Sequence, residues 1–419
     1  MNTPLARALP AVYAAAALRV AFPLVVLPVM AARLGADQFG QLSLFLVWAG
    51  LISTVVEGGF LAAATRDAVR ADAAGRARLA TQVFSARCAL SLLVLPLAFG
   101  VVWVFVPQAS EAHPWSASLL LALLACVLGW PATWYMQASQ QLHRWALVEL
   151  GVYAAWLVAA LALVHSVAAY LVLNIVAALL LAVLGWGWLA RDLAQTPAQA
   201  PLWSRAAVRP GLRLGWTMMP VAVAGAAYSY ALPAVASSQM ERSQLGIYYL
   251  ADRIVRSVLN AAEPMFQLVY PRIVARFALG PRVALRYAAR WAGAGLAVVA
   301  ALLAIAVLGW PLVRGNIALA GQGVDALLLE QVFAVLGLLL PLLLGWKFFG
   351  YWMLGSGGFD RAYRACVFVG GVFGVTAAWL LAQRGAVALA WVALTVEAVV
   401  IATALAGIAI TLQVRGRAR

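Results

Sequence analysis

The chain has 419 residues, of which 65% are hydrophobic and only 10% charged, whereas a soluble domain carries roughly 25% charged residues. A mean hydropathy of +0.94 excludes a soluble domain of any size. The net charge of +15 would favour nucleic acid as the partner of a soluble chain. In a membrane protein it indicates basic cytoplasmic loops, and the acidic partner it implies is a lipid headgroup or an anionic lipid-borne substrate.

Apolar runs recur from end to end, and each is long enough to cross the ~30 Å of hydrocarbon in a bilayer. Such runs must be helices, because lipid offers no partner to free backbone groups. The sequence therefore predicts an all-α integral membrane protein with about twelve transmembrane helices. In chain order we expect helices at 11–31, 41–63, 81–106, 116–138, 145–165, 167–190, 214–237, 245–269, 291–313, 328–352, 363–382 and 386–412. The first run is too long for a signal-peptide core, so we expect it to remain as a helix.

The arginines decide the expected orientation. With a cytoplasmic N-terminus, 20 arginines fall on the inside and four on the outside. The outside ones are Arg33, Arg242, Arg314 and Arg384. Because basic residues concentrate in cytoplasmic loops, we expect a bacterial inner-membrane protein with both termini in the cytoplasm.

An internal repeat links the second and eighth predicted helices at a constant offset of 206 residues. The matched pairs are Gln38 with Gln244, Gly40 with Gly246, Glu57 with Glu263, Arg66 with Arg272 and Arg70 with Arg276. Shared loop chemistry, in which Gly begins a helix and Arg ends it, is the alternative. A repeat of six helices predicts two lobes, 1–200 and 201–419, in the same orientation, with a binding site between them near mid-membrane.

The eighth predicted helix carries a polar stripe whose members recur every three or four residues and so share one broad face. The stripe consists of Tyr249, Asp252, Arg253, Arg256, Asn260, Glu263 and Gln267. Arg256 is ~16 Å from either helix end, which is too deep for easy snorkelling. Asp252 can pair with Arg256 at i, i+4, which leaves Arg253 less neutralised. The stripe lines a cavity or forms a closed ion-pair network that holds helices together.

Other charges fall within predicted helices, where ionisable groups are by default candidates for function. Arg19 lies ~12 Å into the first helix and lines the cavity or snorkels to the surface. Arg87 is shallower, and we expect it to snorkel. For Lys347 both interpretations stand equally.

Two carboxyl groups and three aromatic side chains complete the candidates. Glu57 and Glu397 could bind and release a proton as coupling sites, because apolar surroundings favour the neutral acid; permanently protonated carboxyls are the alternative. Tyr228 is well placed for a cavity. Trp134 and Tyr135 suit sugar stacking, but the aromatic belt at the membrane interface is the favoured interpretation.

The sequence lacks the motifs of several classes of enzyme and metal-binding protein. No Walker A or nucleophile-elbow sequence occurs, which argues against ATP hydrolysis and an enzyme. The histidines and the three cysteines have no metal-ligand spacing, so we expect no metal, no cofactor and no disulfide framework.

Two segments carry a family resemblance: RLGADQFGQLSLF, which runs into the second helix, and YYLADRIVRSVLNAAEPMFQLVYPRIVAR, which covers the eighth. They resemble the polysaccharide-transporter family, the Wzx-type O-antigen and exopolysaccharide flippases of the multidrug/oligosaccharidyl-lipid/polysaccharide exporter superfamily. The resemblance implies two six-helix lobes around a central cationic cavity that opens alternately inward and outward. The related lipid II flippases usually have fourteen helices, which makes that branch a poorer match.

The resemblance also implies a substrate, undecaprenyl-pyrophosphate-linked oligosaccharide, moved from the cytoplasmic to the periplasmic leaflet. Arg19, Arg253, Arg256 and Lys347 would then attract the pyrophosphate, because guanidinium binds phosphate oxygens bidentately. Membrane lipids and the polysaccharide polymerase machinery are the other expected partners. A multidrug antiporter of the same fold is the first alternative; a membrane glycan enzyme and a structural scaffold are the others.

Overall fold

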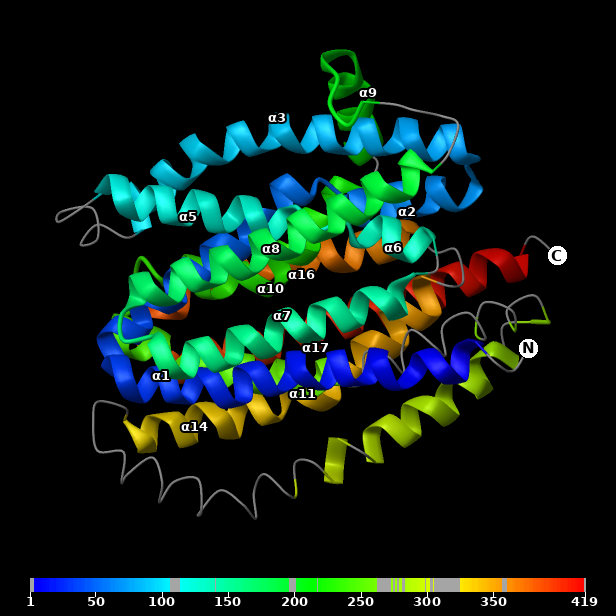
Figure 1. Ribbon diagram of the computed structural model, residues 1–419. Coiled ribbons are helices and arrows are strands. Elements are labelled where there is room, and N and C mark those ends of the chain that lie inside the picture. The colour runs from blue at the N-terminus through cyan, green and yellow to red at the C-terminus, as the bar shows by residue number, and fades with distance from the viewer. Residues whose placement is uncertain are drawn as a thin grey trace. The chain divides into compact units, whose positions relative to one another are not determined.

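The structure is a computed structural model (Figure 1) that describes residues 4–105, 114–139, 141–195, 201–216, 218–261, 283–297, 299–301, 325–355 and 360–417, with isolated positions between 273 and 304. Within these residues every regular element is a helix. The elements of the first half are α1 (Pro4–Glu57), α2 (Phe60–Arg70), α3 (Ala73–Phe105), α5 (Pro114–Gly129), α6 (Thr133–Ala138), α7 (Leu142–Leu163), α8 (Val167–Ala194) and α9 (Arg205–Trp216). Those of the second half are α10 (Met219–Ala236), α11 (Arg242–Ala261), α14 (Ala326–Gly337), α15 (Leu339–Trp346), the π-helix η1 (Lys347–Gly355), α16 (Asp360–Leu381), the short 3₁₀ helix η2 (Ala382–Arg384) and α17 (Ala386–Arg417).

Eight helices in the described part of the chain are long and apolar enough to cross a membrane. They are Asp37–Glu57, Ala73–Val104, Trp115–Ala138, Arg144–Leu163, Val167–Ala194, Ala326–Leu354, Ala362–Arg384 and Ala386–Ile410. Helix α11 is not among them, and it carries four charged residues. The predicted class, a multi-pass all-α membrane protein, is confirmed. The predicted helices 245–269 and 291–313 extend beyond the described residues.

Several helix boundaries differ from the predicted ones. The first predicted helix and most of the second lie within α1, separated by a kink at Gly35, where φ is 76°. The second ends at Glu57 instead of residue 63. Helix α3 begins at Ala73 instead of residue 81. The fourth predicted helix is broken at residues 130–132, since Pro131 cannot donate an intrahelical hydrogen bond.

The chain divides into two compact units, and each is described by itself. The first comprises residues 1–19 and 41–230, and the second residues 20–40 and 231–419. In the first unit α3 packs against α5 and α9, and α7 and α5 pack against α8. In the second unit α17 contacts α11, α14, α15 and α16. The lobe boundary predicted after residue 200 stays a prediction.

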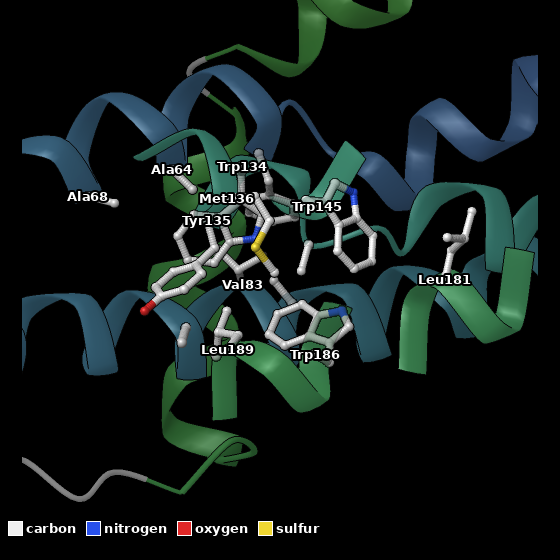
Figure 2. Packing of buried hydrophobic residues seen from close by; sticks show 14 of the residues in the cluster. Ala64, Ala68, Val83, Trp134, Tyr135, Met136, Trp145, Leu181, Trp186 and Leu189 are labelled. Carbon is white, nitrogen blue, oxygen red and sulfur yellow. The ribbon is translucent and has the colours of Figure 1, made fainter. Parts of the chain in front are cut away.

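The core of the first unit is rich in large aromatic side chains (Figure 2). Trp134 and Tyr135 of the short helix α6 are buried there with Trp145 of α7 and Trp186 of α8. The aromatic-belt interpretation of Trp134 and Tyr135 is therefore wrong. The break before α6 turns these side chains into the packed interior, and a pattern of residue types along a straight helix could not predict that.

Candidate functional site

Helix α11 carries the polar stripe, and glycines let its first turns lie against α1. A side chain at Gly40 of α1 would overlap the backbone carbonyl of Arg242, and one at Gly246 would press on the backbone of Gly40. The two backbones therefore meet in direct contact, which only glycine allows. Gly40 and Gly246 are also a matched pair of the internal repeat.

A side-chain cap joins the start of α11 to that of α17. The Oε1 atom of Gln244 accepts a hydrogen bond from the backbone N–H of Ala386 at 3.1 Å, one of the first N–H groups of α17 that lack an intrahelical partner. Gly385, with φ of 95°, passes directly beside this amide. The end of α11 that precedes the stripe is thus anchored to two other helices of the same unit.

The middle of α11 brings four predicted residues together. The Nε atom of Arg256 donates to Oδ1 of Asp252 at 2.8 Å, and Asp252 is buried. The guanidinium carbon of Arg253 lies 4.9 Å from the centre of the Tyr249 ring, within the range of a cation–π interaction. The predicted i, i+4 pair is present. Of the three remaining stripe residues, the side chain of Asn260 and the whole of Glu263 and Gln267 lie outside the described residues.

Acidic groups occur on the helices that pack against α11. Helix α14 carries the half-buried Glu330, and α17 carries Glu397, whose side chain is only 1% exposed. Glu330 was not singled out from the sequence, although its place in an apolar run was a usable signal. Two arginines and three carboxyl groups thus occur on adjoining helices, an arrangement that can bind an anion or exchange ion-pair partners.

The other cationic candidates differ in how fully they are described. Lys347 is half-buried at the first position of the π-helix η1, an element type found frequently at functional sites. Arg19 lies on α1 and Tyr228 on α10, but both side chains lie outside the described residues. The roles predicted for these three residues stay predictions.

Glu57 lies where α1 ends and α2 begins. Its two carboxylate oxygens accept hydrogen bonds from the backbone N–H groups of Gly59, at 2.9 Å, and Leu61, at 2.6 Å. Gly58 and Gly59 both have positive φ, which bends the chain so that the carboxylate reaches the free N–H groups at the start of α2. In the structure Glu57 therefore caps the start of α2. Its role in proton coupling stays a prediction.

Arg87 does not snorkel, contrary to the sequence-based expectation. Its side chain is 2% exposed, and Nη1 donates to the carbonyl oxygens of Trp130 at 2.8 Å and Pro131 at 2.9 Å. Its guanidinium also lies 5.6 Å from the centre of the Phe60 ring. Because α3 begins eight residues earlier than predicted, Arg87 is ~21 Å along the helix and faces the break between α5 and α6.

Solved structures with this fold are transporters. A multidrug resistance MATE family transporter of the MOP superfamily in an inward-facing conformation matches with a TM-score of 0.67 and 16% identity, over 96% of this chain and 98% of that one. The outward-facing conformation of such a transporter matches with 0.59 and 13%, over 97% and 94%. A MOP superfamily transporter from Pyrococcus furiosus, described by the reverse polarity of its binding pocket, matches with 0.53 and 14%, over 97% and 95%. The chain thus has the fold of MOP superfamily transporters, which have twelve helices in two lobes.

The family follows from the sequence itself. The profile described as "Polysaccharide biosynthesis protein" matches residues 11–276, which is 266 of the 419 residues. The chain belongs to this family, as the resemblance of its second and eighth helices predicted. No curated protein matches the sequence.

Proposed function

We propose that this protein is a flippase that moves undecaprenyl-pyrophosphate-linked oligosaccharide from the cytoplasmic to the periplasmic leaflet of the bacterial inner membrane by alternating access. The family and the transporter fold support the proposal. The observation that carries it is the pair of arginines on α11, Arg253 and Arg256, held within an apolar helical unit. Arg19 and Lys347 are proposed to contribute further positive charge.

The contacts of the two arginines suit a pyrophosphate. Guanidinium groups form bidentate hydrogen bonds to phosphate oxygens. Asp252 accepts a hydrogen bond from the Nε atom of Arg256, which orients the guanidinium group. The ring of Tyr249 supports the guanidinium of Arg253. Both arginines are thus oriented before a substrate arrives, and preorganisation lowers the entropic cost of binding.

The proposal is tested in a strain that lacks the protein. We expect lipid-linked oligosaccharide to accumulate in the membrane and polymer to disappear from the cell surface, and wild-type protein to restore both. Arg253→Gln should restore less than about a tenth of the surface polymer, since a charge-assisted hydrogen bond contributes roughly 1.5–3 kcal/mol.

The matched control is Arg144→Gln, which removes an exposed arginine from α7 and should complement like the wild type. Equal membrane levels of the two variants are verified by immunoblot. Unchanged surface polymer and an unchanged level of lipid-linked oligosaccharide in the deletion strain would contradict the flippase proposal.

A drug antiporter is the second candidate, because the solved structures of this fold include multidrug resistance transporters. In that case the deletion strain should become sensitive to cationic drugs while its surface polymer stays normal. Glu57 and Glu397 would be the first residues to test for proton coupling under either function. In the flippase we propose that the glycan occupies a hydrated cavity while the prenyl chain stays in lipid.

A further inference from the structure

Helix α9 presents a charged and aromatic face that no part of the proposed transport mechanism uses. Arg205, Arg209 and Arg213 recur every four residues, so they share one face, and all three are exposed. At about 100° per residue, Leu212 and Trp216 fall on the same face. Trp216 is 67% exposed and Leu212 38% exposed.

The opposite face of α9 is fixed to α3. Gly211 and Gly215 are buried, and a side chain at Gly211 would overlap the backbone carbonyl of Gln82. The two helices therefore cross in backbone contact, and Figure 1 shows α9 against α3. Such a contact leaves the arginine face no freedom to turn inward.

Hydrogen bonds also hold the segment that leads into α9. The hydroxyl of Thr81 donates to the carbonyl oxygen of Pro201 at 2.6 Å, and the backbone N–H of Ser204 donates to the hydroxyl of Ser85 at 2.9 Å. Trp203, between these two contacts, is 55% exposed. The exposed tryptophans Trp203 and Trp216 therefore lie at the two ends of a rigidly attached helix.

The charge of this face is not offset along the chain. No Asp or Glu occurs between Asp192 and Glu241, and Asp192 accepts hydrogen bonds from Tyr135 and Gln141. Tryptophan is enriched in the headgroup region of membranes, and helices with arginine on the polar side and tryptophan or leucine beside it lie in that region. If this face met only water, Trp203, Trp216 and Leu212 would expose apolar surface to solvent.

We propose that the exposed face of α9 binds the headgroups of anionic phospholipids and so seats the first unit on the membrane surface. The arginines contact lipid phosphates, and Trp203 and Trp216 enter the boundary between headgroups and acyl chains. This lipid is a constant partner of the protein and is separate from the transported substrate, so the inference holds whichever substrate is carried.

The test uses the full-length protein purified in a neutral detergent. Binding of phosphatidylglycerol and phosphatidylcholine is measured by native mass spectrometry and by the shift of the thermal unfolding midpoint on lipid addition. We expect the wild type to bind phosphatidylglycerol in preference. The triple variant R205Q/R209Q/R213Q should bind it at least about tenfold more weakly at low ionic strength, and added salt should reduce the difference.

Two matched variants make the result specific. R205K/R209K/R213K keeps the charge and should retain most of the binding. R144Q/R286Q/R290Q removes three exposed arginines elsewhere and should bind like the wild type. Equal losses in the two glutamine variants would show binding by net charge alone and overturn the proposal. Wild-type binding by R205Q/R209Q/R213Q would also overturn it and leave the face to an acidic protein partner.

Discussion

At the scale of single residues, two charged side chains of the first unit, Glu57 and Arg87, bond to backbone groups. Glu57 accepts from N–H groups freed at the start of α2, and Arg87 donates to carbonyl groups freed at the break before α6. The carbonyl of Trp130 also accepts from the indole N–H of Trp186 at 2.9 Å. Each charge therefore lies beside an interruption of a helix, where unpaired backbone groups of the opposite polarity are available.

Arg87→Gln should destabilise the protein, because the carbonyl of Pro131 would lose the hydrogen bond from Nη1. An unsatisfied buried acceptor costs roughly 1–3 kcal/mol, so we expect the thermal unfolding midpoint of the purified protein to fall. Arg78→Gln removes an exposed arginine of the same helix and should change stability by less than about 0.5 kcal/mol. Equal midpoints for the two variants would contradict a stabilising role of the Arg87 hydrogen bonds.

At the scale of elements, glycine decides which helices approach most closely. Gly40 and Gly246 occupy equivalent positions of the internal repeat, and the structure places them against each other. The repeat inferred from the sequence stays a prediction. Glycine also allows the close contact between α9 and α3, where Gly211 lies against the backbone of Gln82.

Gly40→Ala should force α1 and α11 apart, because the added carbon would overlap the carbonyl of Arg242. Overpacking of this kind costs roughly 1–3 kcal/mol and should lower the unfolding midpoint. The control is Gly151→Ala in α7, where the added carbon meets nothing within 4 Å. There we expect no loss, since alanine is the better helix former by about 0.5–1 kcal/mol. A neutral Gly40→Ala would mean that the two helices can move apart freely.

At the scale of the whole molecule, the distribution of arginines predicts which segments face the cytoplasm. The strong bias toward one set of loops gives cytoplasmic termini under the positive-inside rule. The structure adds exposed positions suitable for labelling on both expected sides: Asp37 and Glu241 on the outside, Arg191 and Arg209 on the inside.

Single cysteines at these positions, in a background without Cys88, Cys126 and Cys366, test the topology. In intact cells, after permeabilisation of the outer membrane, an impermeant maleimide should label Asp37→Cys and Glu241→Cys. The same reagent should reach Arg191→Cys and Arg209→Cys only after the inner membrane is opened. The reverse labelling pattern would overturn the orientation.

The sequence by itself determined the class, the approximate places of most spans and the stripe on α11. Hydropathy and helical spacing are local properties, and lipid permits few other structures. Tertiary structure decided which individual side chains are buried. Trp134 and Tyr135 entered the core and Arg87 was buried because α3 begins early and the fourth predicted helix breaks at Pro131. Which groups a side chain meets there depends on the neighbouring helices, and these lie far away in the sequence.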